Sequence, residues 1–191
     1  MKRFISYLLS FCVSISMVFC VSEAGAVFLL ISPGAAAQGA GEAQVARAAD
    51  AYTSYFNPAG LSFIDGDEVV LQHCNWLPNL ASDIYFDFIG FNKHIGLGTL
   101  GGHLIYLNLG AQDQTNSEGL ILGQFRSYMT ALTLGYSTTL KPHSSIGFNF
   151  KIYHQRLADS AVSGEGGGGG SDEGASTDLA FDLGYLLKFG K

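Results

Sequence analysis

The sequence predicts an all-β fold, in which a short N-terminal segment acts as a plug beside a partial antiparallel transmembrane β-barrel of about six strands. Three observations predict it. Charged residues make up only 14% of the 191 residues, while 25 glycines, 14 Phe and 9 Tyr are present. Apolar residues recur at every second position from Asp65 onward, and the chain starts with an export signal. This combination suits a sheet with one face in lipid and the other on a lumen.

The export signal occupies residues 1–24. Lys2 and Arg3 precede an apolar run from Phe4 to Val21, and the small residues of Ser22-Glu23-Ala24 provide a cleavage site. We expect this segment to be removed as a signal peptide. A retained anchor is the alternative, but the apolar core is short for a spanning helix. A lipoprotein is disfavoured because the bulky Phe19 precedes Cys20.

Six stretches alternate with a period of two, as expected for strands with two different faces. They cover residues 67–76, 83–91, 95–109, 128–137, 146–153 and 179–188. A short connection at 141–144 contrasts with a long one at 158–177, which is the pattern of periplasmic turns and external loops in outer-membrane barrels. A soluble β-sandwich explains the alternation equally well and is kept as the alternative.

The alternation also assigns side chains to faces. We expect arginine to be rejected at a lipid-facing position such as Phe150 and tolerated at a lumenal one such as Asn149. Charged side chains at Asp87, Asp182 and Lys151 are expected on the lumenal face. The residues expected to face lipid are Phe148, Phe150, Phe181 and Leu183, and the lumenal set is completed by Asn149.

Three connecting segments carry further expectations. The alanine-rich stretch 42–50 is expected to form a turn or two of helix. Asn57-Pro58-Ala59-Gly60 is expected to form a turn, because proline holds the preceding residue in an extended conformation. Residues 112–118 are expected to form a polar loop.

No motif in the sequence predicts catalysis, a cofactor or a metal. Gly96, Gly98 and Gly101 match the spacing of a dinucleotide fingerprint, but a β-prone stretch follows them where that motif needs a helix. His73 and Cys74 are adjacent in a strand and therefore point to opposite faces. The glycine-rich stretch 164–174 lacks the lysine of a phosphate-binding loop. Weak calcium capture there is a minor alternative, through Glu165, Asp172 and Glu173.

Charge and cysteine content exclude two further classes. The net charge of −6 offers no basic patch, so a nucleic-acid partner is not expected. Cys12 and Cys20 lie in the signal, so Cys74 alone remains in the mature chain and no intrachain disulfide is possible.

The N-terminal part of the mature chain resembles a known family. The stretch from Phe28 to Ala46, followed by that from Ala49 to Leu61, is similar to the start of PorV/PorQ proteins, which are outer-membrane barrels related to the FadL transporters. The matching motif residues are Gly39, Gly41, Glu42, Ala43, Tyr55, Asn57, Pro58, Ala59, Gly60 and Leu61.

The resemblance implies a function in type IX protein secretion, where the protein would escort exported cargo at the outer membrane. The partners it implies are outer-membrane lipid and secretion-apparatus subunits or the C-terminal domains of cargo. FadL-like transport of hydrophobic solutes is the alternative. The resemblance also implies a barrel of about fourteen strands, so a chain with about six is expected to be a truncated member.

Together these arguments divide the chain into three segments. Residues 1–24 are the signal peptide, 25–64 the plug-like segment with the Asn-Pro-Ala-Gly-Leu turn, and 65–191 the strands of an incomplete barrel.

Overall fold

A computed structural model describes residues 26–116, 118–157 and 174–189. The chain divides into two units, residues 1–30 and 31–191. In the first unit, Val27–Leu30 forms the single 3-10 turn η1. All the other elements of the described residues lie in the second unit. None of the described helices has the length and apolar character needed to cross a membrane.

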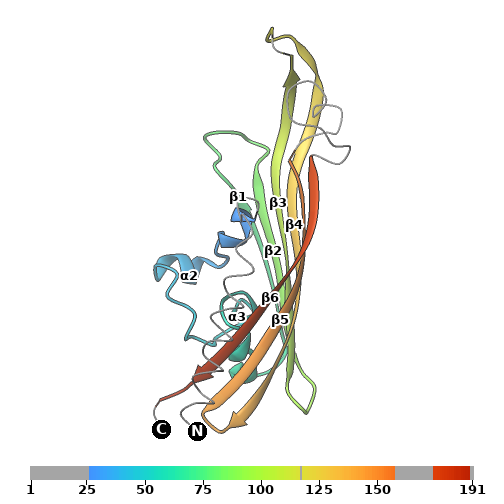
Figure 1. Cartoon of the computed structure of the whole chain (residues 1–191). Helices are drawn as coiled ribbons and strands as arrows, with labels where there is room; N and C mark the ends of the chain where they lie inside the picture. Colours follow the sequence, from blue (N-terminus) through green and yellow to red (C-terminus); the bar gives the residue numbers. More distant parts are fainter. Residues whose placement is uncertain (1–25, 117, 158–173, 190–191) are drawn as a thin grey trace, which may run out of the picture. The chain divides into compact units, whose positions relative to one another are not determined.

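Six strands form one antiparallel sheet in which each strand pairs with its neighbours in the sequence (Figure 1). The predicted all-β fold is therefore confirmed, and the sheet fits part of a barrel whose open edges are the first and last strands. The strands are β1 (Glu68–Asn75), β2 (Tyr85–His94), β3 (Thr99–Thr115), β4 (Ile121–Lys141), β5 (Ser144–Arg156) and β6 (Ala175–Leu187).

One face of the sheet, here called the apolar face, carries large apolar side chains that remain exposed. Phe148, Phe181 and Leu183 are 52%, 74% and 80% exposed, and the ring of Phe150 packs at a tilt against that of Phe181 with centroids 5.2 Å apart. Further exposed side chains on this face are Ile89, Leu100, Leu104, Leu132, Leu134, Ile146, Ile152 and Leu179.

The opposite face, here called the covered face, is mostly small and polar. The expected assignment of Asn149, Lys151 and Asp182 to this face is confirmed, because they alternate with the exposed apolar residues of β5 and β6. Its buried polar side chains include Asn92, Thr99, His103, Thr133, Ser137, Ser145 and Gln155.

The segment before β1 lies against the covered face. It contains α2 (Ala35–Gly39), α3 (Thr53–Phe56) and the 3-10 helix η2 (Pro58–Phe63). Ala51 and Leu61 are fully buried, as are Phe88 and Ile105 of the sheet. The apolar core of this unit thus lies between the segment and the sheet.

Three expectations about local structure are wrong. Residues 42–50 form turns instead of helix, and the helix lies earlier, in α2. Most of the predicted loop 112–118 belongs to β3, which runs to Thr115, because its polar side chains interact with those of the neighbouring strand β4. Gln124 Nε2 donates to Asp113 Oδ1 at 2.8 Å.

The third wrong expectation concerns Asp87, which lies on the apolar face. The register of β2 places it opposite His73, and its Oδ1 lies 2.6 Å from His73 Nδ1. His73 and Cys74 do point to opposite faces, as the alternation of burial along β1 shows.

Candidate functional site: the buried Asn-Pro-Ala-Gly-Leu segment

The motif residues Asn57 to Leu61 form the centre of the contact between the N-terminal segment and the sheet. Asn57 is extended, at φ −158° and ψ 107°, as predicted from the proline that follows it. Its Oδ1 accepts a hydrogen bond from the Ala59 backbone N–H at 3.1 Å, which caps η2. Pro58 is the first residue of η2, where its missing N–H costs nothing. The predicted turn is therefore the start of a six-residue 3-10 helix.

The amide group of Asn57 ties this helix to two distant places. Its Nδ2 donates to the carbonyl of Val45 at 3.0 Å and to the carbonyl of Tyr185 in β6 at 3.4 Å. Asn57 is 7% exposed, so these bonds form away from water. One side chain thus joins the preceding loop, η2 and the last strand.

The carbonyl of Ala59 is held by two serine hydroxyls from neighbouring strands. Ser137 Oγ of β4 donates to it at 3.0 Å, and Ser145 Oγ of β5 donates at 2.6 Å. All three residues are fully buried. Hydrogen bonds of this kind compensate the desolvation of a backbone group that the fold removes from water.

Two strand glycines make room for η2. A Cβ at Gly147 of β5 would lie 2.5 Å from the Pro58 carbonyl carbon, and one at Gly184 of β6 would overlap the side chain of Asn57. Neither contact leaves space for alanine. The close approach of the helix backbone to the sheet therefore depends on these glycines.

The last two residues of the motif pack by shape. A Cβ at Gly60 would lie 2.5 Å from Thr53 Cγ2, so only glycine lets α3 and η2 approach this closely. Leu61 has 0% exposure and fills the space above Gly101 of β3. Gly101, which matched the dinucleotide spacing in the sequence, is thus a packing residue.

A polar cluster beside the motif fixes α3 to the middle of the sheet. Ser54 Oγ lies 2.9 Å from His103 Nδ1, and the Ser54 carbonyl accepts a 2.9 Å hydrogen bond from Asn149 Nδ2. Asn149 also donates to Asp182 Oδ2 at 3.0 Å, and Lys151 Nζ lies 2.8 Å from the same oxygen. Ser54, His103 and Asn149 are all at most 2% exposed, so this cluster is a structural link between segment and sheet.

This burial overturns the expectation that arginine would be tolerated at Asn149. That expectation assumed a side chain in lumenal water. Asn149 is instead 1% exposed and in contact with the N-terminal segment, so a larger charged side chain has no space and loses hydration.

The earlier motif residues lie apart from this contact. Gly39 ends α2, and Gly41 and Glu42 follow with φ of +62° and +65°, a left-handed pair that reverses the chain. Ala43 continues this turn. Burial, and secondarily the charge of Glu42, raises the pKa of Tyr55 to about 12. The carboxylate of Glu42 therefore lies close enough to Tyr55 to affect the pKa of its hydroxyl.

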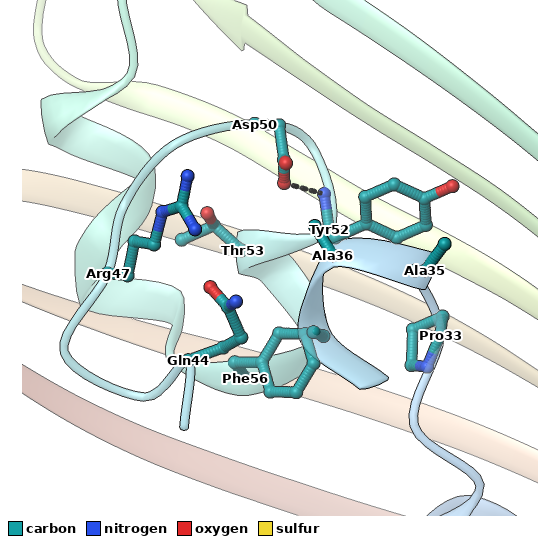
Figure 2. A pocket seen from close by; sticks show the side chains of 11 residues that line it. Pro33, Ala35, Ala36, Gln44, Arg47, Asp50, Tyr52, Thr53 and Phe56 are labelled. Atoms are coloured by element: carbon teal, nitrogen blue, oxygen red, sulfur yellow. Dashed lines mark hydrogen bonds between the residues drawn. The ribbon is translucent and has the colours of Figure 1, made fainter. Parts of the chain in front are cut away.

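A small cavity lies between α2, the stretch of residues 44–50 and α3 (Figure 2). Its volume is about 50 Å³, and its lining includes Gln44, Arg47, Tyr52 and Phe56. Asp50 Oδ1 accepts a 3.1 Å hydrogen bond from the Tyr52 backbone N–H at its rim. The space suits a water molecule rather than a substrate. In the described ranges no three His, Cys, Asp or Glu side chains are grouped to hold a metal ion.

Sequence reasoning missed two features of the sheet, of which the first lies on the apolar face. The first is a tyrosine row, Tyr85, Tyr106 and Tyr128, which crosses β2, β3 and β4 with ring centroids 6.0 and 5.9 Å apart. At the other end of the face, Tyr136 packs against Phe148 at 6.1 Å. The period of two located these positions, but their alignment depends on the strand register.

The second missed feature is the tip of the β3–β4 hairpin. Leu120, Ile121 and Leu122 are consecutive and 60%, 65% and 56% exposed. The predicted polar loop ended at residue 118 and no element was predicted for residues 119–127, whereas β4 begins at Ile121 and the β3–β4 hairpin extends beyond the neighbouring strands (Figure 1).

Comparison with known proteins decides the family. The model of the family described as type IX secretion system protein PorV matches residues 20–172. The chain belongs to the PorV family. Membership assigns it to the type IX secretion system and to the proteins of the outer membrane, and PorV is not a known enzyme family. Neither the curated proteins nor the solved structures include a match.

Proposed function

We propose that this PorV-family chain lies in the outer membrane with its apolar face against lipid and escorts exported cargo in type IX secretion. The proposal is built on family membership, on the two faces of the sheet and on the apolar hairpin tip. It includes removal of residues 1–24 as a signal peptide and the use of residues 25–64 as a plug.

The spacing of aromatic side chains supports the lipid contact. Tyr128 and Tyr136 lie eight residues apart on β4, which is about 26 Å along a strand and roughly 20 Å across a bilayer at the usual tilt. Leu132 and Leu134 lie between them and are about half exposed. Outer-membrane barrels have an apolar band of about 25 Å between two aromatic girdles.

The connections between strands indicate which end is external. Those at the Tyr136 end are short, with residues 95–98 between β2 and β3 and residues 142–143 between β4 and β5. At the tyrosine row, two connections are longer, with residues 76–84 and 157–174 separating the strands, and the third, between β3 and β4, spans residues 116–120. Long connections face outward in outer-membrane barrels. The hairpin tip would then lie outside the cell.

The single observation that carries the escort function is the exposed Leu120-Ile121-Leu122 tip. Three adjacent apolar side chains in water are unfavourable unless a partner covers them, and such patches mark protein contacts. The tip extends beyond the level of the tyrosine row, where lipid would no longer cover it. It is therefore the proposed contact for cargo or for a subunit of the secretion apparatus.

A test is co-purification from the outer membrane with the C-terminal domain of an exported cargo protein. The variant L120S/I121S/L122S is expected to retain at most about a tenth of the cargo, since it loses most of the buried apolar area. Leu97→Ser is the matched control, because Leu97 is 84% exposed at the opposite end of the sheet. Equal cargo retention by both variants would contradict a docking role for the tip.

A cavity beside β1 favours the transport alternative. It has a volume of about 650 Å³ and is lined in part by Tyr52, Trp76 and Phe86. Aromatic walls of this kind suit an apolar solute. Deletion of the gene separates the two functions: escort predicts that cargo accumulates in the periplasm, whereas transport predicts intact secretion and slower fatty-acid uptake.

A further inference from the structure

Two of the few cationic side chains of this acidic protein lie on the apolar face beside the tyrosine row. The whole chain has 10 Lys and Arg against 16 Asp and Glu. Arg126 lies two residues before Tyr128 on β4, toward the hairpin tip, and Arg156 of β5 is paired in register with Tyr128. Arg126 is exposed and Arg156 is half-buried.

The tyrosines and arginines line one open cavity of about 720 Å³. Tyr85, Tyr106 and Tyr128 form its aromatic side, and Asn108 and Gln124 add amide groups. Its volume is that of a ligand-sized cleft. It opens on the face that the proposed function places in lipid, at the level of the external headgroups.

Among the described residues of the lining, Asp83 is the one carboxylate, and it already accepts a hydrogen bond. Asp83 Oδ2 accepts a 2.9 Å hydrogen bond from the Ala111 backbone N–H. Among the described lining residues, the guanidinium groups of Arg126 and Arg156 outnumber this carboxylate. Guanidinium groups bind phosphate through paired hydrogen bonds, and they do so more strongly where lipid excludes water.

We propose that this cavity binds the phosphate of a phosphorylated lipid in the outer leaflet. Arg126 and Arg156 hold the phosphate oxygens, the amides of Asn108 and Gln124 donate to the remaining acceptors, and the tyrosine row packs against the sugar or glycerol part of the headgroup. The inference rests on the proposed membrane orientation. It adds a lipid ligand that cargo escort does not require.

Another cation on the same face allows this placement to be tested. Lys93 of β2 is exposed at the Tyr136 end, where the short connections lie. In the described strands, arginine occurs in β4 and β5 alone. A guanidinium group can donate two parallel hydrogen bonds to one phosphate, which the ammonium group of lysine does not do. Lys93 therefore provides a control cation on the same face and at the opposite membrane surface.

The test uses the full chain inserted into phosphatidylcholine vesicles doped with diphosphoryl lipid A. The lipid retained after detergent extraction and purification is quantified by mass spectrometry. Wild-type protein is expected to retain lipid A, and R126Q/R156Q at least tenfold less, because each lost charged hydrogen bond weakens binding by about that factor. Lys93→Gln is expected to match the wild type. Arg126→Gln alone is also expected to reduce the retention of lipid A. Because the Arg126 side chain is exposed, misfolding would not explain this loss.

Two further arms identify the source of the phosphate. Lipid A without phosphates should be retained poorly, and 10-fold excess inorganic phosphate should not displace the bound lipid. Equal retention by R126Q/R156Q and wild type, equal retention of the dephosphorylated lipid, or displacement by free phosphate would each overturn the proposal. Vesicle flotation without lipid A tests the orientation separately: protein that fails to float contradicts the proposed membrane function, and the lipid site with it.

Discussion

The hydroxyl of Ser145 in β5 donates a 2.6 Å hydrogen bond to the carbonyl of Ala59, 86 residues earlier in the chain. Ser137 of β4 donates to the same oxygen. A backbone carbonyl of the motif thus bridges two paired strands. The motif acts as the buried connection between the N-terminal segment and the sheet, and its conformation follows from that contact.

Gly147→Ala is expected to destabilise this contact by about 1–3 kcal/mol, because the new Cβ would overlap the backbone at Pro58. Urea unfolding of the protein in vesicles measures the change. Gly123→Ala in β4 is the control, since the nearest atom to its Cβ is Gln114 Oε1 at 3.7 Å. A control as costly as Gly147→Ala would show that the close approach of η2 is not responsible.

Substitutions of Asn57 should separate its two functions. Asn57→Ala removes both the helix cap and the amide donors, with an expected cost of about 2 kcal/mol or more. Asn57→Ser keeps an oxygen that can cap η2 and loses the bonds to Val45 and Tyr185, so an intermediate cost is expected. Identical unfolding curves for the two variants would mean that the cap contributes nothing measurable.

Leu132→Arg tests whether the apolar face contacts lipid. Leu132 is 47% exposed and lies midway between Tyr128 and Tyr136, so arginine there should weaken insertion by about 2–4 kcal/mol. Folding yield in vesicles gives the measurement. Leu97→Arg, in the short turn before β3, should be nearly neutral, and comparable yields for the two variants would argue against a lipid-facing surface.

The Tyr55 hydroxyl should titrate late. Burial raises its pKa to about 12 in the folded protein, above the value of 10 for an unfolded tyrosine. The neutral form is therefore favoured by folding, and this stabilisation is complete below pH 10 and is lost between pH 10 and 12. Absorbance at 295 nm should show a late phase that disappears in Tyr55→Phe. A Tyr55→Phe titration identical to wild type would contradict the assignment.

The sequence alone determined how side chains alternate between the two faces within a strand. The period of two placed Phe148 and Asn149 on opposite sides, because successive side chains of a strand alternate by geometry. It also determined the extended conformation of Asn57, since the following proline restricts it locally. The family motif could be recognised because its residues fall in two short stretches of sequence, 39–43 and 55–61.

Tertiary structure decided what each face contacts. From its sequence pattern, Asn149 is expected to be a polar side chain in lumenal water. In the folded chain it is buried against the N-terminal segment, where it donates to the Ser54 carbonyl. The alignment of Tyr85, Tyr106 and Tyr128 depends on register, and that of Arg156 with Tyr128 does as well. Register and packing arise from contacts between residues far apart in the chain, so no local pattern in the sequence specifies them.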